Sequence, residues 1–126
     1  MLFWILSGLV VFLANIYLPT ALYLPTEGLG RHLGPRDNLP EPGVMVGRAR
    51  RSLANFQENL PFFLTLSVLA LVIEGVDMAQ AVLGAQIFVI SRVAYIALYV
   101  AGVPLLRSLA YMVGLLGCAL MALALV

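Results

Sequence analysis

LFWILSGLVVFLANIYLPTALYL, residues 2–24, is an apolar run without a charged side chain. A helix of about 20 apolar residues spans the hydrocarbon core of a bilayer, so this segment is long enough to cross a membrane. It lacks the basic stretch that opens a cleavable signal peptide, and we expect it to remain as a helix. Asn15 lies inside the run. A polar side chain at that depth usually faces another helix rather than lipid.

The composition of the whole chain indicates the same class of protein. Of its 126 residues, 63% are hydrophobic and 10% are charged, and the mean hydropathy is +1.04. A soluble domain carries roughly 25% charged residues. The length fits one domain. The net charge of +1 and the lack of a basic patch with exposed aromatics argue against a nucleic-acid partner.

Three further helices follow the first. Prolines and glycines are dense over residues 25–43, which predicts a loop. Apolar stretches then predict helices at about 44–73, 78–100 and 105–126, separated by short turns at 74–77 and 102–104. Short connections make consecutive helices antiparallel neighbours. We therefore predict an all-α fold: a single four-helix transmembrane domain over residues 1–126.

The distribution of arginines predicts the orientation of this domain. The chain contains no lysine, and most of its arginines lie in the first loop and at the start of the second helix: Arg31, Arg36, Arg48, Arg50 and Arg51. Arg107, at the turn before the last helix, lies on the same side. Cytoplasmic segments of membrane proteins are enriched in basic residues. We expect the arginine-bearing side to be cytoplasmic and both termini to lie on the other side.

The second helix carries a polar stripe. At about 100° per residue, the polar side chains of its first half fall on one face about 80° wide. They are Arg48, Arg51, Asn55 and Glu58. A charged side chain inside a bilayer costs a few kcal/mol, about 2.5–3.5 on insertion scales, and is a functional candidate by default. We expect the stripe to face protein or water.

The third helix repeats the arrangement with Arg92, Tyr95 and Tyr99, which also share one face. Arginines hold carboxylates through paired hydrogen bonds. A carboxylate such as that of Glu58 can hold an ammonium group, and tyrosines offer apolar faces with a hydroxyl at the tip. Together the two faces suit a small zwitterionic ligand with more than one carboxylate.

Each of these residues also has a structural interpretation. Arg48, Arg50 and Arg51 could be interfacial anchors that set the topology, and for Arg50 alone this is the better interpretation. Glu58 could be the ion-pair partner of Arg51 or Arg92. Asn55 could make an interhelical hydrogen bond. The occurrence of matching polar faces on two helices favours a binding site.

The second helix resembles the signature of the MAPEG proteins, the membrane-associated proteins in eicosanoid and glutathione metabolism. That signature has an arginine-rich entry, then an asparagine, a glutamate three residues later and a Pro-Phe pair. The matching residues here are Arg51, Asn55, Glu58, Pro61 and Phe62. The run RVAYIALY, residues 92–99, the chain length and the four-helix layout are similar too. The chain looks like a compact bacterial member related to the microsomal glutathione transferases.

This resemblance implies a homotrimer in a bacterial inner membrane, with a glutathione site between subunits near the cytoplasmic half. Glutathione would be a co-substrate, and no metal is implied. The residues implied to contact it are Arg48, Arg51, Asn55 and Glu58 on one subunit, Arg92, Tyr95 and Tyr99 on a neighbour, and Arg31 at the end of the first helix. Arg107 would be the catalytic residue that activates the thiol. The implied reaction adds the glutathione thiolate to a hydrophobic electrophile or reduces a lipid hydroperoxide.

Other functions remain open at this point. A non-catalytic member of the same family would bind glutathione or lipid without turnover. A small four-helix exporter of cations would need a carboxylate in its first helix, and residues 1–24 contain none. A purely structural membrane protein is the remaining alternative. The complete set of Arg51, Asn55 and Glu58 favours glutathione binding, although it does not by itself indicate turnover. Between the family alternatives we favour an enzyme, namely a glutathione transferase.

Overall fold

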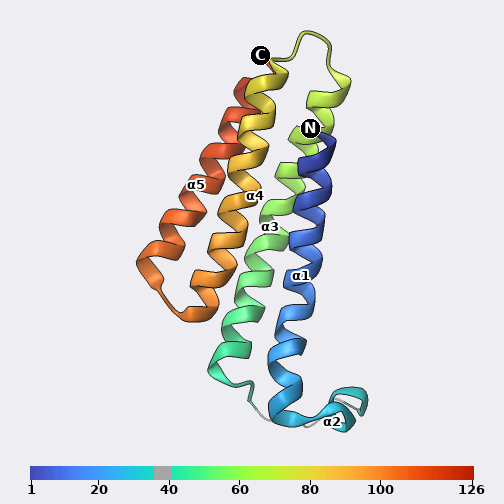
Figure 1. The fold of residues 1–126 in the computed structure, drawn as a ribbon, viewed down its shortest axis with the longest axis vertical. Helices are drawn as coiled ribbons and strands as arrows, with labels where there is room; N and C mark the ends of the chain where they lie inside the picture. The colour runs from blue at the N-terminus through green and yellow to red at the C-terminus, as the bar shows by residue number, and fades with distance from the viewer. Residues whose placement is uncertain (36–40) are drawn as a thin grey trace.

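Four long helices form an antiparallel bundle in the computed structural model, which describes residues 1–35 and 41–126 except the side chains of Glu27 and Arg31. The long helices are α1 (Leu2–Glu27), α3 (Val44–Val72), α4 (Met78–Ala101) and α5 (Pro104–Leu123) (Figure 1). The short helix α2 (Leu29–Leu33) lies in the first connection. The predicted all-α four-helix fold is confirmed.

The first helix ends later than Pro25. A proline near the end of a helix removes one hydrogen bond without stopping the chain, and α1 continues to Glu27. It ends at Gly28, which has a φ of 81° that glycine adopts more readily than other residues. The segment expected to be an irregular loop contains α2, and Arg31 belongs to this short helix. At the other turn, Pro104 is the first residue of α5 because its fixed φ suits a helix start.

Both chain termini lie at the end of the bundle that carries the turn between α3 and α4 (Figure 1). The backbone N–H of Asp77 in this turn donates to the carbonyl of Ala124, 3.1 Å away. The opposite end carries α2, the start of α3 and the turn between α4 and α5. The arginines near the start of α3 and Arg107 therefore share one end of the molecule, opposite the termini.

Three phenylalanines from α3 and α4 form the centre of the core, together with aliphatic side chains. Phe56, Phe63 and Phe88 are almost fully buried, and the rings of Phe63 and Phe88 stack with their centroids 4.5 Å apart. Large apolar side chains such as Phe3, Val72 and Leu105 are exposed on the outside. A soluble protein rarely exposes apolar surface this extensively, and lipid is the solvent that suits it.

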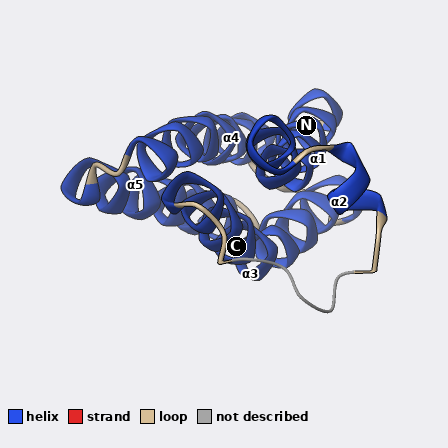
Figure 2. Cartoon of the chain, turned by 90° about the horizontal axis from the view of Figure 1, so that it is seen from below, coloured by secondary structure: helices blue, strands red, loops and turns tan. Residues whose placement is uncertain are grey.

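The helix α3 differs from the other three. In the described chain, α1, α4 and α5 are long and apolar enough to span a membrane. With 29 residues α3 also has the length, but Arg48, Arg50, Arg51 and Glu58 make its first half too polar. This difference agrees with the polar stripe that the sequence places on the first half of this helix. The end-on view in Figure 2 shows α3 packed beside these helices.

The closest helix pair is α4 and α5, because glycines face each other at their contact. A Cβ atom on Gly84 would lie 2.5 Å from the carbonyl oxygen of Gly117, and one on Gly117 would lie 2.6 Å from that of Gly84. Small residues let membrane helices approach closely enough for backbone contact. This contact fixes α5 against the helix that carries Tyr95 and Tyr99.

Candidate functional site

The site is built around Arg92, which lies on α4 and has no exposed surface. Its Nη1 donates a hydrogen bond to Oδ1 of Asn55 on α3, 2.8 Å away. Nε and Nη2 have no hydrogen-bond partner within the described part of the chain. Both residues belong to the same chain, whereas the resemblance placed the Arg92 face on a neighbouring subunit.

Aromatic rings surround the Arg92 guanidinium. Its central carbon lies 5.1–5.7 Å from the ring centroids of Phe56, Phe88, Tyr95 and Tyr111. A cation over an aromatic ring is attracted by the ring quadrupole, most strongly where water is excluded. Gly114 lies against the same part of α4: a Cβ atom there would lie 2.6 Å from Oγ of Ser91, the residue next to Arg92. Arg92 is therefore a core residue that contacts the site through Asn55.

The hydrogen bond from Arg92 orients the side chain of Asn55. An asparagine amide has one oxygen acceptor and one nitrogen donor group. Because Oδ1 accepts from the buried arginine, the Nδ2 donor group is the part of the amide that remains for another partner. Asn55 also lines a cavity. The interhelical hydrogen bond that we considered as an alternative for Asn55 thus exists alongside a role in the cavity.

A polar cavity of about 270 Å³ opens between α3, α4 and α5. Four of the residues that the sequence indicated line it: Asn55, Tyr95, Tyr99 and Arg107. The guanidinium carbon of Arg107 lies 4.3 Å from the ring centroid of Tyr99. The rings of Tyr95 and Tyr99 meet edge to face at 5.4 Å. The cavity therefore combines a half-buried cation, an amide donor and two phenols.

Three further lining residues come from α5: Ser108, Tyr111 and Met112. They were not among the residues that the sequence indicated. With Arg107 they are spaced i, i+1, i+4 and i+5, which is one face of a helix. That spacing was the available signal, but α5 is so apolar that the face could not be distinguished from ordinary packing.

The other members of the polar stripe lie elsewhere. Arg51 and Glu58 are exposed on the surface of the single chain. Within the described residues Glu58 makes no ion pair with Arg51 or Arg92, so that alternative is not observed. The side chain of Arg31 lies outside the described part of the structure.

Arg48 joins two helices at the arginine-bearing end. Its Nη1 donates to the carbonyl of Val100 near the end of α4, 3.3 Å away, and its guanidinium packs against Gly102. A cation near the C-terminus of a helix is favoured by the helix dipole. This contact supports a structural interpretation of Arg48.

The comparison with protein families is decisive for identity. A model of the MAPEG family matches residues 1–126, the whole chain. The chain belongs to the MAPEG family. Searches of curated proteins and of solved structures found no match. As a MAPEG protein it is an integral membrane protein, and the family supports a glutathione-related function at a general level.

Family membership also agrees with the location of the polar side chains. Polar side chains on membrane helices are costly in lipid, so they face protein or water, as the buried and half-buried polar groups do here. Within the described residues, no cluster of His, Cys, Asp and Glu could hold a metal ion. The chemistry available at the cavity is thus that of Arg107, the tyrosines and Asn55.

Proposed function

We propose that the protein is a membrane-bound glutathione transferase or peroxidase. The observation that carries this proposal is the cavity in which Asn55, Tyr95, Tyr99 and Arg107 meet. A guanidinium, an amide donor and phenol hydroxyls suit the carboxylates, peptide groups and thiol of glutathione. The match to the MAPEG family supports the same ligand.

Arg107 is the proposed catalytic residue. A guanidinium beside a thiol stabilises the thiolate and lowers the pKa of the thiol. In conjugation, the sulfur forms a bond to the electrophilic carbon, the leaving group departs with its electron pair, and the thiol proton passes to water. In peroxide reduction, two glutathione molecules supply two electrons and yield an alcohol, water and glutathione disulfide.

A second subunit would complete the site. The cavity in one chain, about 270 Å³, is slightly below the usual range of ligand pockets, roughly 300–1,000 Å³. Arg51 and Glu58 are exposed on a helix of the membrane bundle, where charged side chains need protein or water beside them. We propose a homotrimer in which these residues, with Arg31, contact glutathione at the boundary between subunits.

We further propose that the arginine-bearing end faces the cytoplasm of a bacterium and that both termini lie outside the inner membrane. This places the cavity on the side where basic residues concentrate. The second substrate would be hydrophobic, because apolar surface and lipid surround the bundle.

The test uses the detergent-purified protein with glutathione and 1-chloro-2,4-dinitrobenzene. We expect saturable glutathione binding, thiolate absorbance and conjugate formation. Asn55→Ala should weaken glutathione binding, and Arg50→Ala, which changes an exposed arginine away from the cavity, should not. Binding without thiolate or product would favour a non-catalytic glutathione-binding protein, and no binding would overturn the proposal.

A further inference from the structure

A second site is indicated by Asn15, near the middle of α1. The side chain is only 1% exposed, yet neither Oδ1 nor Nδ2 has a hydrogen-bond partner in the described structure. Most buried side-chain polar atoms in proteins have a partner, so an unpaired buried amide needs an explanation. We expected Asn15 to face another helix; it is buried as expected, but no helix supplies a partner.

The backbone at this level of α1 is also short of one donor. In an α-helix the carbonyl of residue i accepts from the N–H of residue i+4. Pro19 is four residues after Asn15 and has no N–H. The Asn15 carbonyl therefore lacks its usual helix donor, and the amide and this carbonyl make one polar spot in an otherwise apolar helix.

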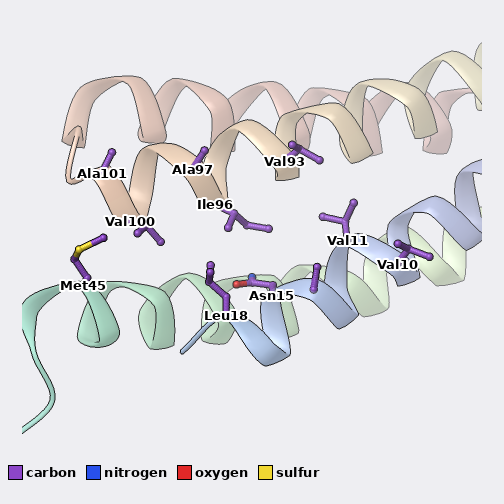
Figure 3. A pocket seen from close by; sticks show the side chains of 11 residues that line it. Val10, Val11, Asn15, Leu18, Met45, Val93, Ile96, Ala97, Val100 and Ala101 are labelled. Atoms are coloured by element: carbon purple, nitrogen blue, oxygen red, sulfur yellow. The ribbon is translucent and has the colours of Figure 1, made fainter. Parts of the chain in front are cut away.

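Asn15 lines an apolar groove between α1 and α4, with a volume of about 610 Å³ (Figure 3). Its walls include Val11 and Leu18 from α1 and Ile96 and Val100 from α4, and Met45 of α3 lies at one end. Asn15 is the only polar residue among the described residues of this lining. The groove shares no lining residue with the polar cavity.

The depth of Asn15 limits what its partner can be. At 1.5 Å per residue it lies about 20 Å from Leu2 and about 18 Å from Glu27 along the helix axis. The hydrocarbon core is about 30 Å thick, so a lipid headgroup at either surface is about 15 Å from this level. A headgroup therefore cannot reach the amide. The partner must be a polar group carried within an apolar molecule.

We propose that the groove binds an apolar chain that carries a hydroxyl group partway along its length. The apolar walls hold the chain, and a hydroxyl can both donate to Oδ1 and accept from Nδ2 of Asn15. An ionised group is excluded because the groove has no charged lining residue to pair with it. This proposal concerns a site separate from the cavity and does not depend on glutathione chemistry.

The experiment compares 12-hydroxystearic acid with stearic acid, which differ in a single hydroxyl group. Each acid displaces a fluorescent fatty acid from the full chain in nanodiscs. We expect 12-hydroxystearic acid to bind about fivefold more tightly, the effect of roughly one net hydrogen bond. In Asn15→Leu, stearic acid should still bind, and the preference for the hydroxylated acid should be lost.

Two further variants make the result specific. Ser67→Ala removes another buried and unpartnered polar group, outside the groove, and should leave the preference unchanged. Ala97→Trp fills the groove and should weaken binding of both acids. The thermal unfolding temperature of every variant in detergent separates a folding defect from loss of the groove. This control does not depend on glutathione binding, so the outcome stays distinct from that of the proposed function.

Three results would overturn the proposal. The first is equal affinity of the wild-type protein for the two acids, and the second is an unchanged preference in Asn15→Leu. The third is occupation of the groove by a second copy of the chain. That would appear as cross-linking of copies of a Val10→Cys, Cys118→Ser variant by a bifunctional maleimide, with no displacement of the fluorescent fatty acid by either acid.

Discussion

Arg92 is a charged residue that the fold encloses completely, and its neighbours explain how. Four aromatic rings surround the guanidinium, and Asn55 accepts one of its hydrogen bonds. A buried charge without enough partners is strongly unfavourable. Because Arg92 is held in place, its hydrogen bond also holds the Asn55 side chain, which lines the cavity.

Replacing Arg92 by lysine tests this coupling. Lysine keeps the positive charge but lacks the planar fork that holds the Asn55 oxygen while lying among the rings. We expect Arg92→Lys to reduce glutathione affinity about fivefold, because the hydrogen bond that orients Asn55 is lost and one net hydrogen bond contributes about 1 kcal/mol. Isothermal titration in detergent measures this, and Arg50→Lys is the matched control. Equal affinities for Arg92→Lys and wild type would contradict the coupling.

Arg107 sets the pH dependence of the proposed reaction. A cation favours the thiolate, so its removal raises the pKa of the bound thiol, by about one unit or more. In Arg107→Gln the thiolate fraction at pH 7 falls, and we expect about a tenfold slower conjugation rate at that pH. Activity should recover as the pH rises. The pH–rate profile and the thiolate absorbance check this, with Arg50→Gln as control. An unshifted profile would remove Arg107 from thiol activation.

At the scale of the helix, the contact of α4 with α5 decides whether the cavity exists. Tyr95 and Tyr99 lie on α4, and Arg107 and Tyr111 lie on α5. The backbones of the two helices touch at Gly84 and Gly117, because glycine has no Cβ atom to keep them apart. The geometry of the cavity therefore depends on residues that do not line it.

Gly84→Leu should separate the two helices. A Cβ atom there meets backbone of α5, which cannot move aside as a flexible side chain would. Overpacking of this kind costs about 1–3 kcal/mol or more. We expect a lower thermal unfolding temperature in detergent and weaker glutathione binding. Gly43→Leu is the control, because a Cβ atom at Gly43 meets nothing within 4 Å. Unchanged stability in Gly84→Leu would contradict this packing argument.

At the scale of the whole molecule, the exposed polar face of α3 is the feature behind the proposed trimer. Arg51 and Glu58 are exposed in the single chain, although the rest of the bundle presents an apolar surface. Lipid is a poor solvent for these side chains. A second copy beside α3 would provide them with polar partners.

Native mass spectrometry of the detergent complex should give a mass of three chains. We expect Arg51→Ala and Glu58→Ala each to weaken glutathione binding, because each removes a charged contact to the ligand or to the neighbouring subunit. A rough size for the loss of one charge-assisted hydrogen bond is about 1.5–3 kcal/mol, or about 10–150-fold in affinity. A monomeric complex with unchanged binding in both variants would refute this site assignment.

The sequence by itself determined the class of the protein, the number of long helices and the family. The length of an apolar run and the density of Pro and Gly are local properties, and they are enough to predict membrane helices and the connections between them. The approximate ends were also predictable. There were two exceptions at helix ends: Gly28 rather than Pro25 ends α1, and α5 ends at Leu123 rather than at residue 126. The short helix α2 in the first connection was not predicted.

Only the tertiary structure decided which polar residues lie together. A helical period gives the direction of each side chain around its own axis, but not the neighbour that this direction meets. Arg51, Asn55 and Glu58 share one stripe, yet Asn55 is bonded to the buried Arg92 and the other two are exposed. Tyr111 lines the polar cavity because α5 packs against α4, and Asn15 lines the apolar groove because α1 packs against α4. Packing between helices depends on residues far apart in the sequence, such as Gly84 and Gly117, so local patterns could not predict it.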